Sequence, residues 1–419
     1  MGNRNMSAPK VTRIAIVGGS IAGCAAAVEL ARSGFEVTVF ERSGEELKDR
    51  GVGIGVPRSV IETFVARDLL DASLPFFPAR SFVRRWRTPA EPRYGYLAWE
   101  QPNTFALLNW GMLYNGLRTR VPVGCYRTEQ TVIAVGGDDS HATLTLSDGT
   151  THDFDLVVCA DGYASLGRRS LFPTTTIQYA GYVLWRGALP ETALIDSTPL
   201  ESGIHSLGYP GGHGIFYFVP AAAGAVGRGQ RMVNWGMYVP VPQPALRDFL
   251  TDKKGRPREG SLSPGTMPLA TERELKDAAH RRLPSYYADL IEASIDTFVY
   301  AIYDCEVPAY RRGRICLIGD AGAFARPHSG AGAFKGMHDA TSLAQALHTH
   351  PTIDAGLAAW NIERTAQGNE LVRFGNQLGR ALVEEIPDWS TMDAASMERW
   401  FTSIVTAKNE IFAPPAARA

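Results

Sequence analysis

Val11-Thr-Arg-Ile-Ala-Ile-Val17, followed at once by Gly18-Gly-Ser-Ile-Ala-Gly23, is the stretch that decides the fold. A nearly continuous apolar, β-branched run is typical of a strand buried on both faces. The alanine-rich segment from Ile21 to Arg32 predicts a helix, and Ser33-Gly34 would end it. Phe35 to Phe40 predicts a second strand. Together these segments predict a βαβ unit with a right-handed crossover.

The glycines between strand and helix predict a dinucleotide site. Gly18 would make the tight turn, and Gly23 would let the helix pack closely on the sheet. Ser20 stands where the usual pattern has its middle glycine. Together with Ile21 and Ala22 it forms the start of the helix, where backbone N–H groups and the positive end of the dipole would face a pyrophosphate.

Glu41 ends the second predicted strand, eighteen residues after Gly23. An acid about twenty residues on is expected to bind ribose hydroxyls, and it favours FAD or NAD over NADP. The alternative for each of these features is an ordinary βαβ turn. The combination of strand, glycines, helix and acid favours the dinucleotide site.

Composition narrows the class of protein. The chain has 419 residues, which predicts two or three domains of about 150 residues each. With 42 basic and 43 acidic residues its net charge is -1, so no electrostatic feature favours nucleic acid or an anionic membrane. The five cysteines form no CxxC pair, which favours reduced thiols in a cytoplasmic protein. Met1 to Lys10 has no apolar core, so no signal peptide is expected.

The remaining chain predicts a nucleotide domain interrupted by an antiparallel sheet. Apolar runs at 156–160 and 314–318 predict buried strands, and 331–347 has helical spacing of its apolar residues. Between 182 and 239, short aromatic-rich segments separated by glycine and proline predict an antiparallel sheet, whereas 240–268 is expected to be mostly loop. The predicted fold class is α/β: a Rossmann-like FAD-binding domain with an inserted antiparallel sheet domain and C-terminal helices. The domains expected are 1–75, 105–172 and 300–350 for FAD, 76–104 and 173–299 for substrate, and 351–419 as the C-terminal helical segment.

Two further motifs follow predicted strands. Asp161-Gly162 ends the strand at 156–160, and Gly319-Asp320 ends the strand at 314–318. Arg326-Pro327-His328-Ser-Gly330-Ala331-Gly332 then leads into the last long helix. A glycine-rich turn that begins a helix places backbone N–H groups and partial positive charge beside a ligand. Each motif alone is compatible with an ordinary strand-to-turn junction, so their order along the chain is the informative feature.

This ordered set resembles the class A flavin monooxygenases, the para-hydroxybenzoate hydroxylase fold group, over residues 11 to 375. A closer likeness is to the 2,6-dihydroxypyridine 3-hydroxylase subgroup. It rests on Asn109-Trp110, Trp185-Arg186-Gly187, Asn234-Trp235 with Tyr238, and Arg326 to Gly332 with Lys335. The wider family usually has asparagine at the position of Phe334, and it often has arginine near Asn109, so flavin contacts of the wider family transfer less directly at these two positions.

The resemblance implies the cofactor contacts. Asp320 would bind ribityl or ribose hydroxyls, and Asp161-Gly162 would serve both FAD and a transiently docked NADH or NADPH. The segment 50–54, with Gly53 and Ile54, would lie beside the isoalloxazine. The full set of cofactor residues expected is Gly18, Ser20, Ile21, Ala22, Gly23, Glu41, Arg42, Gly53, Ile54, Asp161, Gly162, Asp320, Pro327, Gly330, Ala331 and Gly332. No HExxH or paired Cys/His cluster suggests a metal site.

The resemblance also implies the reaction. FAD reduced by NAD(P)H would react with O2 to give a C4a-hydroperoxyflavin that hydroxylates an electron-rich aromatic or heteroaromatic ring. We expect a hydroxypyridine or 2-pyridone, free or in a natural product, with a benzenoid phenol as the serious alternative. Carboxylated rings are less favoured, although Arg186 could bind a carboxylate. The expected catalytic residues are His213, Tyr217 and His328, and the expected substrate contacts are Trp185, Arg186, Phe216, Asn234 and Tyr238.

Two other functions stay open at this point. One is a flavin oxidase or dehydrogenase on a related fold, and the other is a nucleotide-binding protein without catalysis. A homo-oligomer, dimeric or higher, is expected from the family resemblance. Alternation along a strand lets only one face meet a ligand, so about half of the aromatics near 213–238 should be plain packing.

Overall fold

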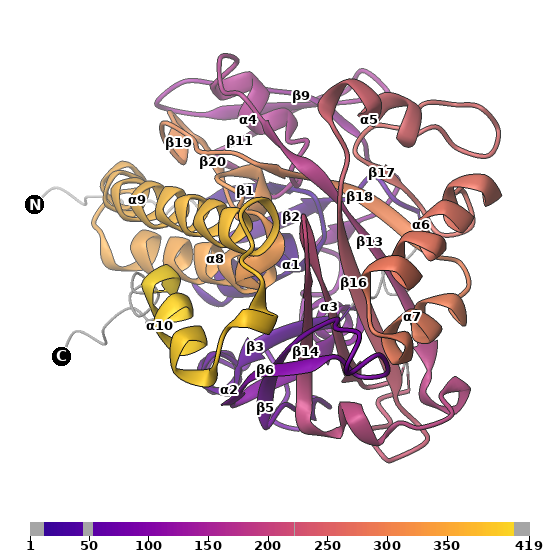
Figure 1. The fold of residues 1–419 in the computed structure, drawn as a ribbon. Coiled ribbons are helices and arrows are strands. Elements are labelled where there is room, and N and C mark those ends of the chain that lie inside the picture. Colours follow the sequence, from indigo (N-terminus) through magenta and orange to yellow (C-terminus); the bar gives the residue numbers. More distant parts are fainter. Residues whose placement is uncertain (1–11, 45–52, 222, 406–419) are drawn as a thin grey trace, which may run out of the picture.

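The structure is a computed structural model that describes residues 12–44, 53–221 and 223–405. Its architecture confirms the predicted α/β class: a Rossmann-like domain, an antiparallel sheet domain and C-terminal helices (Figure 1). Val11 and residues 50–52 of the predicted motifs lie outside the described residues.

The nucleotide domain is built on a six-stranded sheet. Its strands come from four separate parts of the chain and are parallel except for the β19–β20 pair. In spatial order they are β19 (Arg311–Arg312), β20 (Ile315–Leu317), β12 (Leu156–Cys159), β1 (Arg13–Val17), β2 (Glu36–Phe40) and β8 (Tyr126–Arg127). The predicted βαβ unit is therefore at the centre of this sheet.

Four helices pack together beside this sheet. α1 (Ile21–Arg32) has exactly the bounds that the alanine-rich segment predicts, and it contacts both α3 (Trp110–Arg118) and α8 (Gly332–Thr349). α9 (Ile353–Gly379) runs alongside α8 (Figure 1). The interior between them is filled by buried apolar side chains that range from the small Ala25 through Leu343 to the large Trp360.

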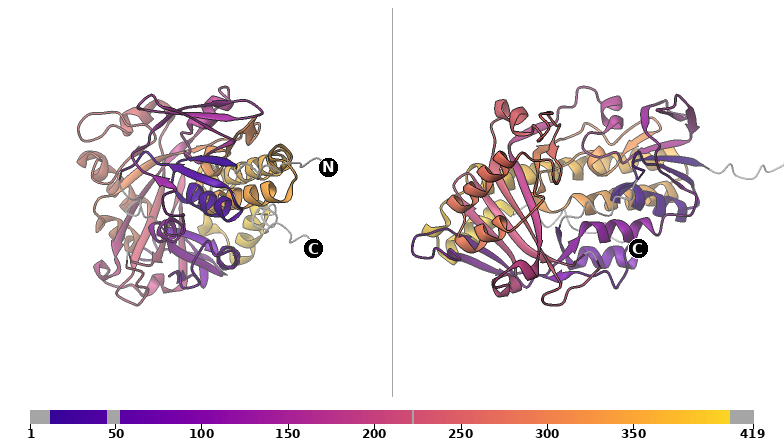
Figure 2. Two further views of the ribbon diagram at one scale, coloured as in Figure 1. Left: turned by 180° about the vertical axis from the view of Figure 1, so that it is seen from behind. Right: turned by 90° about the vertical axis from the view of Figure 1, so that its right-hand side faces the viewer.

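The second domain is built on an eight-stranded sheet. Its order is β17 (Ser261–Leu262), β18 (Phe298–Asp304), β13 (Gln178–Pro190), β16 (Met232–Pro240), β15 (Gly212–Val219), β14 (Gly203–Tyr209), β5 (Ser81–Trp86) and β6 (Tyr96–Pro102). All neighbours are antiparallel except β14 and β5, which are parallel. α6 (Leu269–Arg282) and α7 (Ser285–Glu292) lie on its outer face, as Figure 2 shows in its right-hand view.

Smaller elements connect the two domains. A three-stranded sheet of β3 (Gly53–Pro57), β7 (Phe105–Asn109) and β4 (Phe77–Pro78) lies between them, and its strand β7 leads into α3. The hairpin predicted around 147–149 is present, with β9 (Val132–Gly137), β10 (Ala142–Leu146) and β11 (Thr151–Phe154). The other helices are α2 (Arg58–Ala66), α4 (Leu166–Leu171), α5 (Gln243–Phe249) and α10 (Ala394–Val405).

The structure differs from the sequence prediction in two places. Residues 300–304, placed by sequence in the nucleotide domain, belong to strand β18 of the eight-stranded sheet. The segment 240–268, expected to be mostly loop, contains α5 and the short strand β17. β17 pairs only two residues with β18, a length too short for a period-two pattern to reveal it.

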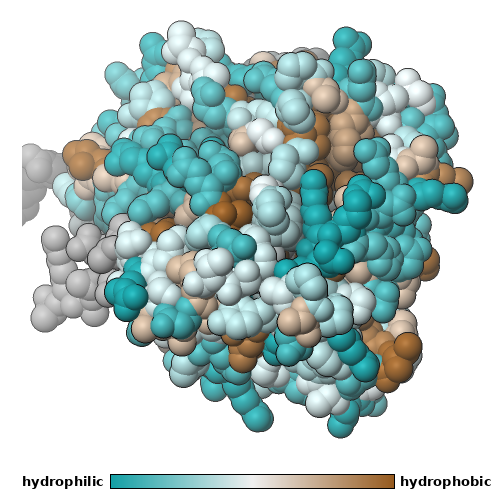
Figure 3. Space-filling view, in the orientation of Figure 1, coloured by the Kyte–Doolittle hydropathy of each residue, from teal (hydrophilic) through white to brown (hydrophobic). Residues whose placement is uncertain are grey.

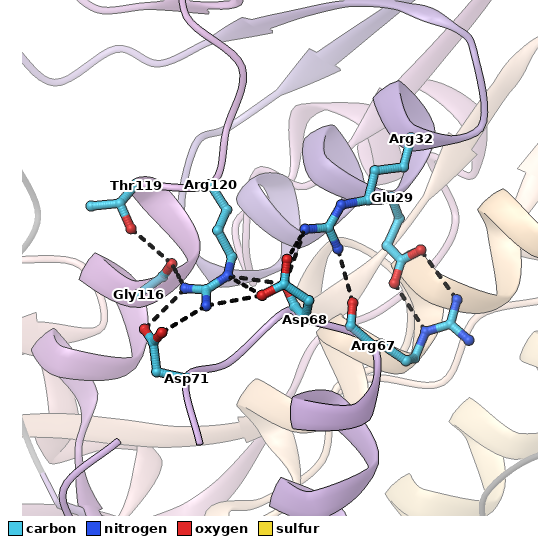
Figure 4. Close-up of polar contacts among 8 residues, drawn as sticks. All are labelled: Glu29, Arg32, Arg67, Asp68, Asp71, Gly116, Thr119 and Arg120. Atoms are coloured by element: carbon cyan, nitrogen blue, oxygen red, sulfur yellow. Dashed lines mark hydrogen bonds and ion pairs between the residues drawn. The ribbon is translucent and has the colours of Figure 1, made fainter. Parts of the chain in front are cut away.

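Ion pairs join α1, the end of α2 and α3 on the surface (Figure 4). Asp68 has a positive φ of 49° and accepts from both Arg32 and Arg120. Arg67 pairs with Glu29 of α1 at 3.0 Å. Exposed pairs of this kind contribute about 0–1 kcal/mol each, so they fix the positions of the helix ends more than they stabilise the fold.

In the part of the chain that the structure describes, no helix is long and apolar enough to cross a bilayer. On the face in Figure 3, hydrophobic residues form small patches separated by hydrophilic ones. All five cysteines are free thiols, in agreement with the reduced state expected from their number and spacing.

Candidate active site

The turn between β1 and α1 has the backbone geometry that its glycines predict. Gly18 has a φ of +97°, and a Cβ there would lie 2.6 Å from the carbonyl oxygen of Ala160. A Cβ on Gly23 would lie 1.9 Å from the carbonyl oxygen of Gly18. Both positions therefore require glycine, because real side chains do not approach backbone oxygens this closely. Ser20 is the N-cap of α1 and leaves the first N–H groups of that helix without a side-chain cap.

Glu41 supports this turn from the end of β2. Its carboxylate accepts hydrogen bonds from the backbone N–H of Gly19 at 2.8 Å and of Ser43 at 2.9 Å. The side chain is buried, whereas Arg42 beside it is exposed. A carboxylate oxygen accepts more than one hydrogen bond, so Glu41 keeps capacity for a ribose hydroxyl.

Asp161 has a structural role that the sequence did not reveal. Its carboxylate accepts from the Ser165 hydroxyl at 2.5 Å and from the Leu166 N–H at 2.6 Å, and so caps α4. Gly162 faces the cavity described below. Arg168 of the same helix donates to the carbonyl oxygens of Asp320 and Ala321, at 2.9 and 3.0 Å. These hydrogen bonds connect the segment after Asp161-Gly162 directly to the Gly319-Asp320 motif, two motifs that are far apart in the sequence.

Asp320 lies in the short helical turn Gly319–Ala321, and its carboxylate is accessible to the cavity. The surrounding protein raises the pKa of Asp320 by desolvation, while the Lys335 ammonium opposes this shift. Lys335 donates to the Gly319 carbonyl oxygen and to Asp339, both at 2.8 Å, and Asp339 accepts from the Gly319 N–H. No described residue donates to the Asp320 carboxylate, so it can accept from the hydroxyls of a cofactor.

A cavity of about 780 Å³ joins these motifs to the inner face of the eight-stranded sheet. Small-molecule sites commonly occupy cavities of about 300–1,000 Å³, so its volume suits a bound organic ligand. The expected cofactor residues that line it are Ser20, Ile21, Ala22, Gly53, Ile54, Gly162, Asp320, Pro327, Gly330 and Gly332. Gly18, Gly23, Glu41, Arg42, Asp161 and Ala331 are absent from its wall.

Two histidines meet at the sheet floor of this cavity. His213 Nε2 lies 3.4 Å from His328 Nδ1, and His328 Nε2 lies 2.9 Å from the Tyr182 hydroxyl. Tyr238 contacts both rings: it is stacked on His213 with centroids 4.7 Å apart, and it is tilted against His328 with centroids 4.3 Å apart. Desolvation lowers the pKa of His213 to about 3 and that of His328 well below its usual value, so both imidazoles are neutral at pH 7.

Arg186 and Asn234 organise the adjoining segment of β3. Arg186 donates to the Tyr300 hydroxyl at 3.0 Å and to the Gly53 carbonyl oxygen at 3.2 Å. The Asn234 side-chain oxygen accepts from the Gly53 N–H at 2.8 Å and from Arg186 at 3.1 Å. Tyr217 also faces this part of the cavity, and a Cβ on Gly53 would lie 2.7 Å from its ring.

Three expected substrate residues do not reach the cavity. Trp185 and Phe216 are fully buried on the outer face of the sheet, where Trp185 packs edge-on against Trp235 and Phe216 packs on Tyr287 of α7. The reason is alternation: Arg186 and Tyr217, one residue along each strand, point inward instead. Asn234 also falls outside the cavity wall and holds Gly53. The prediction that Trp185 and Phe216 contact the substrate is therefore wrong, because both side chains lie on the face of the sheet away from the cavity.

The sequence prediction missed several residues of the cavity wall. Ser206 of β14 lies 3.4 Å from His213 Nδ1, and Arg326 donates to the Tyr182 hydroxyl. Arg84 of β5 and Trp99 of β6 line the far end. The alternating pattern of β5 could have suggested that Arg84 faces the same side as Phe82, but no local signal shows which side is covered.

Comparisons with known proteins find flavin-dependent relatives and nucleotide-binding families. The family described as FAD binding domain-like matches residues 179–304, and the NAD(P)-binding Rossmann-like domain family matches residues 16–45. Over 374 residues the chain is 29% identical to 2,6-dihydroxypyridine 3-monooxygenase of Paenarthrobacter nicotinovorans, covering 86% of this chain and 89% of that protein. It is 24% identical to 6-hydroxynicotinate 3-monooxygenase of Bordetella bronchiseptica, covering 90% and 94%. The solved 2,6-dihydroxypyridine-3-hydroxylase from Arthrobacter nicotinovorans superposes with a TM-score of 0.83 at 25% identity, covering 98% and 99%.

Fold and matches show a flavin-dependent monooxygenase, with FAD as cofactor and NAD(P)H and O2 as co-substrates. The chain resembles the class A family that the motifs predict. Within that family it is similar to the 2,6-dihydroxypyridine 3-hydroxylase subgroup, as the sequence indicates.

Proposed function

We propose that this enzyme hydroxylates a hydroxypyridine or 2-pyridone ring, free or in a natural product, with a benzenoid phenol as the second candidate. The observation that supports this most is the continuity of one cavity from the helix start at Ser20 to the histidine pair on the sheet floor. A flavin bound along this path would end where a flat ring can rest on the sheet. The relatives named for hydroxypyridine substrates support the pyridine over the benzenoid ring.

When bound, FAD supplies the reduction by NAD(P)H and the activation of O2, and the protein supplies position and exclusion of water. Backbone N–H groups of the turn at 327–332 and the start of α8 would lie beside the flavin pyrimidine edge. Asp320 would accept hydrogen bonds from its ribityl hydroxyls.

We assign proton handling to the pair His213 and His328. A ring hydroxyl would donate to a neutral imidazole of this pair by displacing one of the two 3.4 Å contacts of His213, and this would increase electron density on the ring that is to be hydroxylated. The chain of hydrogen bonds continues from His328 to Tyr182 and from Tyr182 to Arg326. Tyr217 is a third candidate, although burial raises its pKa and leaves its hydroxyl protonated.

The residue assignment is tested by His213→Ala, His328→Ala and Tyr217→Ala, with the exposed histidine variant His141→Ala as control. We expect at least one cavity variant to lose hydroxylation while it retains FAD. If all three keep full hydroxylation, the assignment is wrong.

The reaction is tested by a panel of phenols, salicylates and hydroxypyridines. Each compound is scored by the NAD(P)H oxidation it triggers and by hydroxylated product formed under ¹⁸O₂. A monooxygenase places one labelled oxygen atom in its product, whereas an oxidase places none, and a protein that only binds nucleotide oxidises no NAD(P)H in response to any ring. If only benzenoid rings give product, the pyridine proposal fails and the hydroxylase class stands. Cytoplasmic localisation and homo-oligomerisation stay predictions.

A further inference from the structure

Arg84 is a buried cation at the end of the cavity that lies on the edge of the sheet. Its side chain projects from β5, lines the cavity and has 2% of its surface exposed. Three aromatic rings surround its guanidinium carbon, which lies 4.0 Å from the ring centroid of Phe401, 4.4 Å from that of Phe82 and 4.9 Å from that of Trp99. Such contacts stabilise the charge but satisfy none of its N–H donors.

The guanidinium has no polar partner among the described residues. Its Nε and Nη1 atoms are buried and donate no hydrogen bond. Burial lowers the pKa of Arg84 to about 9, so the group still holds its charge at neutral pH. A charge taken out of water without a partner is costly, and buried charges are ordinarily paired. A ligand carboxylate would supply the opposite charge that Arg84 lacks among the described residues.

The other cationic side chains of the cavity wall already have polar partners among the described residues. Arg326 forms ion pairs with Asp304 at 2.8 Å and with Glu384 at 2.6 Å. Lys335 forms an ion pair with Asp339 at 2.8 Å. Arg186 forms no ion pair with a described carboxylate, and its Nη1 and Nη2 atoms donate to Tyr300, Asn234 and a backbone carbonyl oxygen. Among the described cationic side chains of the cavity wall, Arg84 is thus the one with neither an ion pair nor a hydrogen bond, whereas Arg186 is held by three hydrogen bonds to neutral oxygens.

The sheet register places Arg84 in line with the floor of the site. Arg84 lies opposite Ser206, Ser206 opposite Ile215, Ile215 opposite Gly236, and Gly236 opposite Arg186. All five line the cavity. Four strand spacings of about 4.8 Å put Arg84 about 19 Å from Arg186 along this row. Ser206, next to Arg84 in this row, is also the neighbour of His213.

We propose that Arg84 binds a carboxylate of the substrate, so that the ring hydroxylated here is an aromatic or heteroaromatic acid. A ring resting on Ile215 and Gly236, with its hydroxyl toward the histidine pair, would direct a ring carboxylate toward Arg84. A single guanidinium fits one planar carboxylate through two parallel N–H···O bonds. This inference rests on the proposed hydroxylase function and names its substrate class.

The test uses matched pairs of compounds on the FAD-loaded enzyme: 6-hydroxynicotinate against 2-hydroxypyridine, and salicylate against phenol. Binding is measured from the change in flavin absorbance, so no turnover is required. We expect at least one acid to bind about 10- to 150-fold more tightly than its neutral partner, the range of a charge-assisted hydrogen bond. Equal or weaker binding of both acids in the unmodified enzyme overturns the proposal without any variant.

Arg84→Gln should abolish this preference while the affinity for the neutral rings is retained, and Arg84→Lys should restore part of it. The matched control is Arg85→Gln, because Arg85 neighbours Arg84 on the same strand but does not line the cavity and donates to the Gly95 carbonyl oxygen. An undiminished preference in Arg84→Gln overturns the proposal. If no ring in the panel is hydroxylated, the proposed function fails, whereas the binding measurement still decides the role of Arg84.

Discussion

Gly23 gives the most direct test of how this sequence builds its cofactor site. An alanine there would place its Cβ 1.9 Å from the carbonyl oxygen of Gly18 and 3.0 Å from the Gly18 carbonyl carbon. Ordinary contacts begin at about 3.4 Å, so the start of α1 and the preceding turn would have to separate by roughly 1.5 Å. Both partners are backbone, and no side-chain rotation can relieve the contact.

The expected size of the effect follows from two opposing contributions. Alanine in a helix is favoured over glycine by about 1 kcal/mol, whereas overpacking a tight interior contact costs about 1–3 kcal/mol or more. The helical control is Gly116→Ala in α3, where a new Cβ meets no atom within 4 Å. We therefore expect Gly23→Ala to lower the free energy of unfolding relative to Gly116→Ala, which should equal or exceed the unmodified protein in stability.

FAD affinity should also be lower in Gly23→Ala than in Gly116→Ala. The separation of turn and helix in Gly23→Ala moves the N–H groups that face the pyrophosphate, so we expect weaker FAD binding by at least tenfold, a change of about 1.4 kcal/mol. The assays are thermal unfolding of the apoprotein and titration of FAD followed by flavin fluorescence. The reasoning is refuted if Gly23→Ala matches Gly116→Ala in both stability and FAD affinity.

Three further predictions follow from the described contacts. Asp320→Ala should weaken FAD binding by about 1.5–3 kcal/mol, the value of a charge-assisted hydrogen bond, as measured by equilibrium dialysis; unchanged affinity would contradict the assigned role. Burial lowers the pKa of His205 and His213 from 6.5 to about 3, so the unfolded chain binds more protons between these pH values and stability falls as pH falls through this window. The slope should be up to about 1.4 kcal/mol per pH unit for each histidine, and His205→Leu should reduce it in urea titrations at several pH values. Arg231→Met should destabilise by about 3–5 kcal/mol because it leaves Glu191 buried without its partner, and the double variant with Glu191→Leu should recover part of that loss in denaturant titrations.

Much of the nucleotide domain could be predicted from local patterns. The helix at Ile21–Arg32 has the predicted bounds, and the strand after it begins one residue later than expected. These elements are predictable because apolar runs, alanine content and glycine breaks act within a few residues of one another. The hairpin between β10 and β11 is also predictable from a local pattern, the turn residues between its two strands.

The substrate end of the cavity was less predictable. Alternation predicted that half of the aromatics would face inward, but the residues that face the cavity are Tyr217 and Tyr238, while Trp185 and Phe216 face the helices. A period-two pattern divides a strand into two faces and gives no information on which face a helix covers. The tertiary structure distinguishes the two faces, because α6 and α7 cover one of them and the cavity lies on the other.

By itself, the sequence determined the βαβ unit, the glycines of its turn and the acid at Glu41, because their requirements are local and steric. Only the tertiary structure decided that Arg84 is buried without a partner and that His213 meets His328, 115 residues away in sequence. These properties depend on the register of strands from distant segments and on the rings that exclude water around a charge. Desolvation is a property of the assembled surroundings of a group, so no pattern of neighbours along the chain can reveal it.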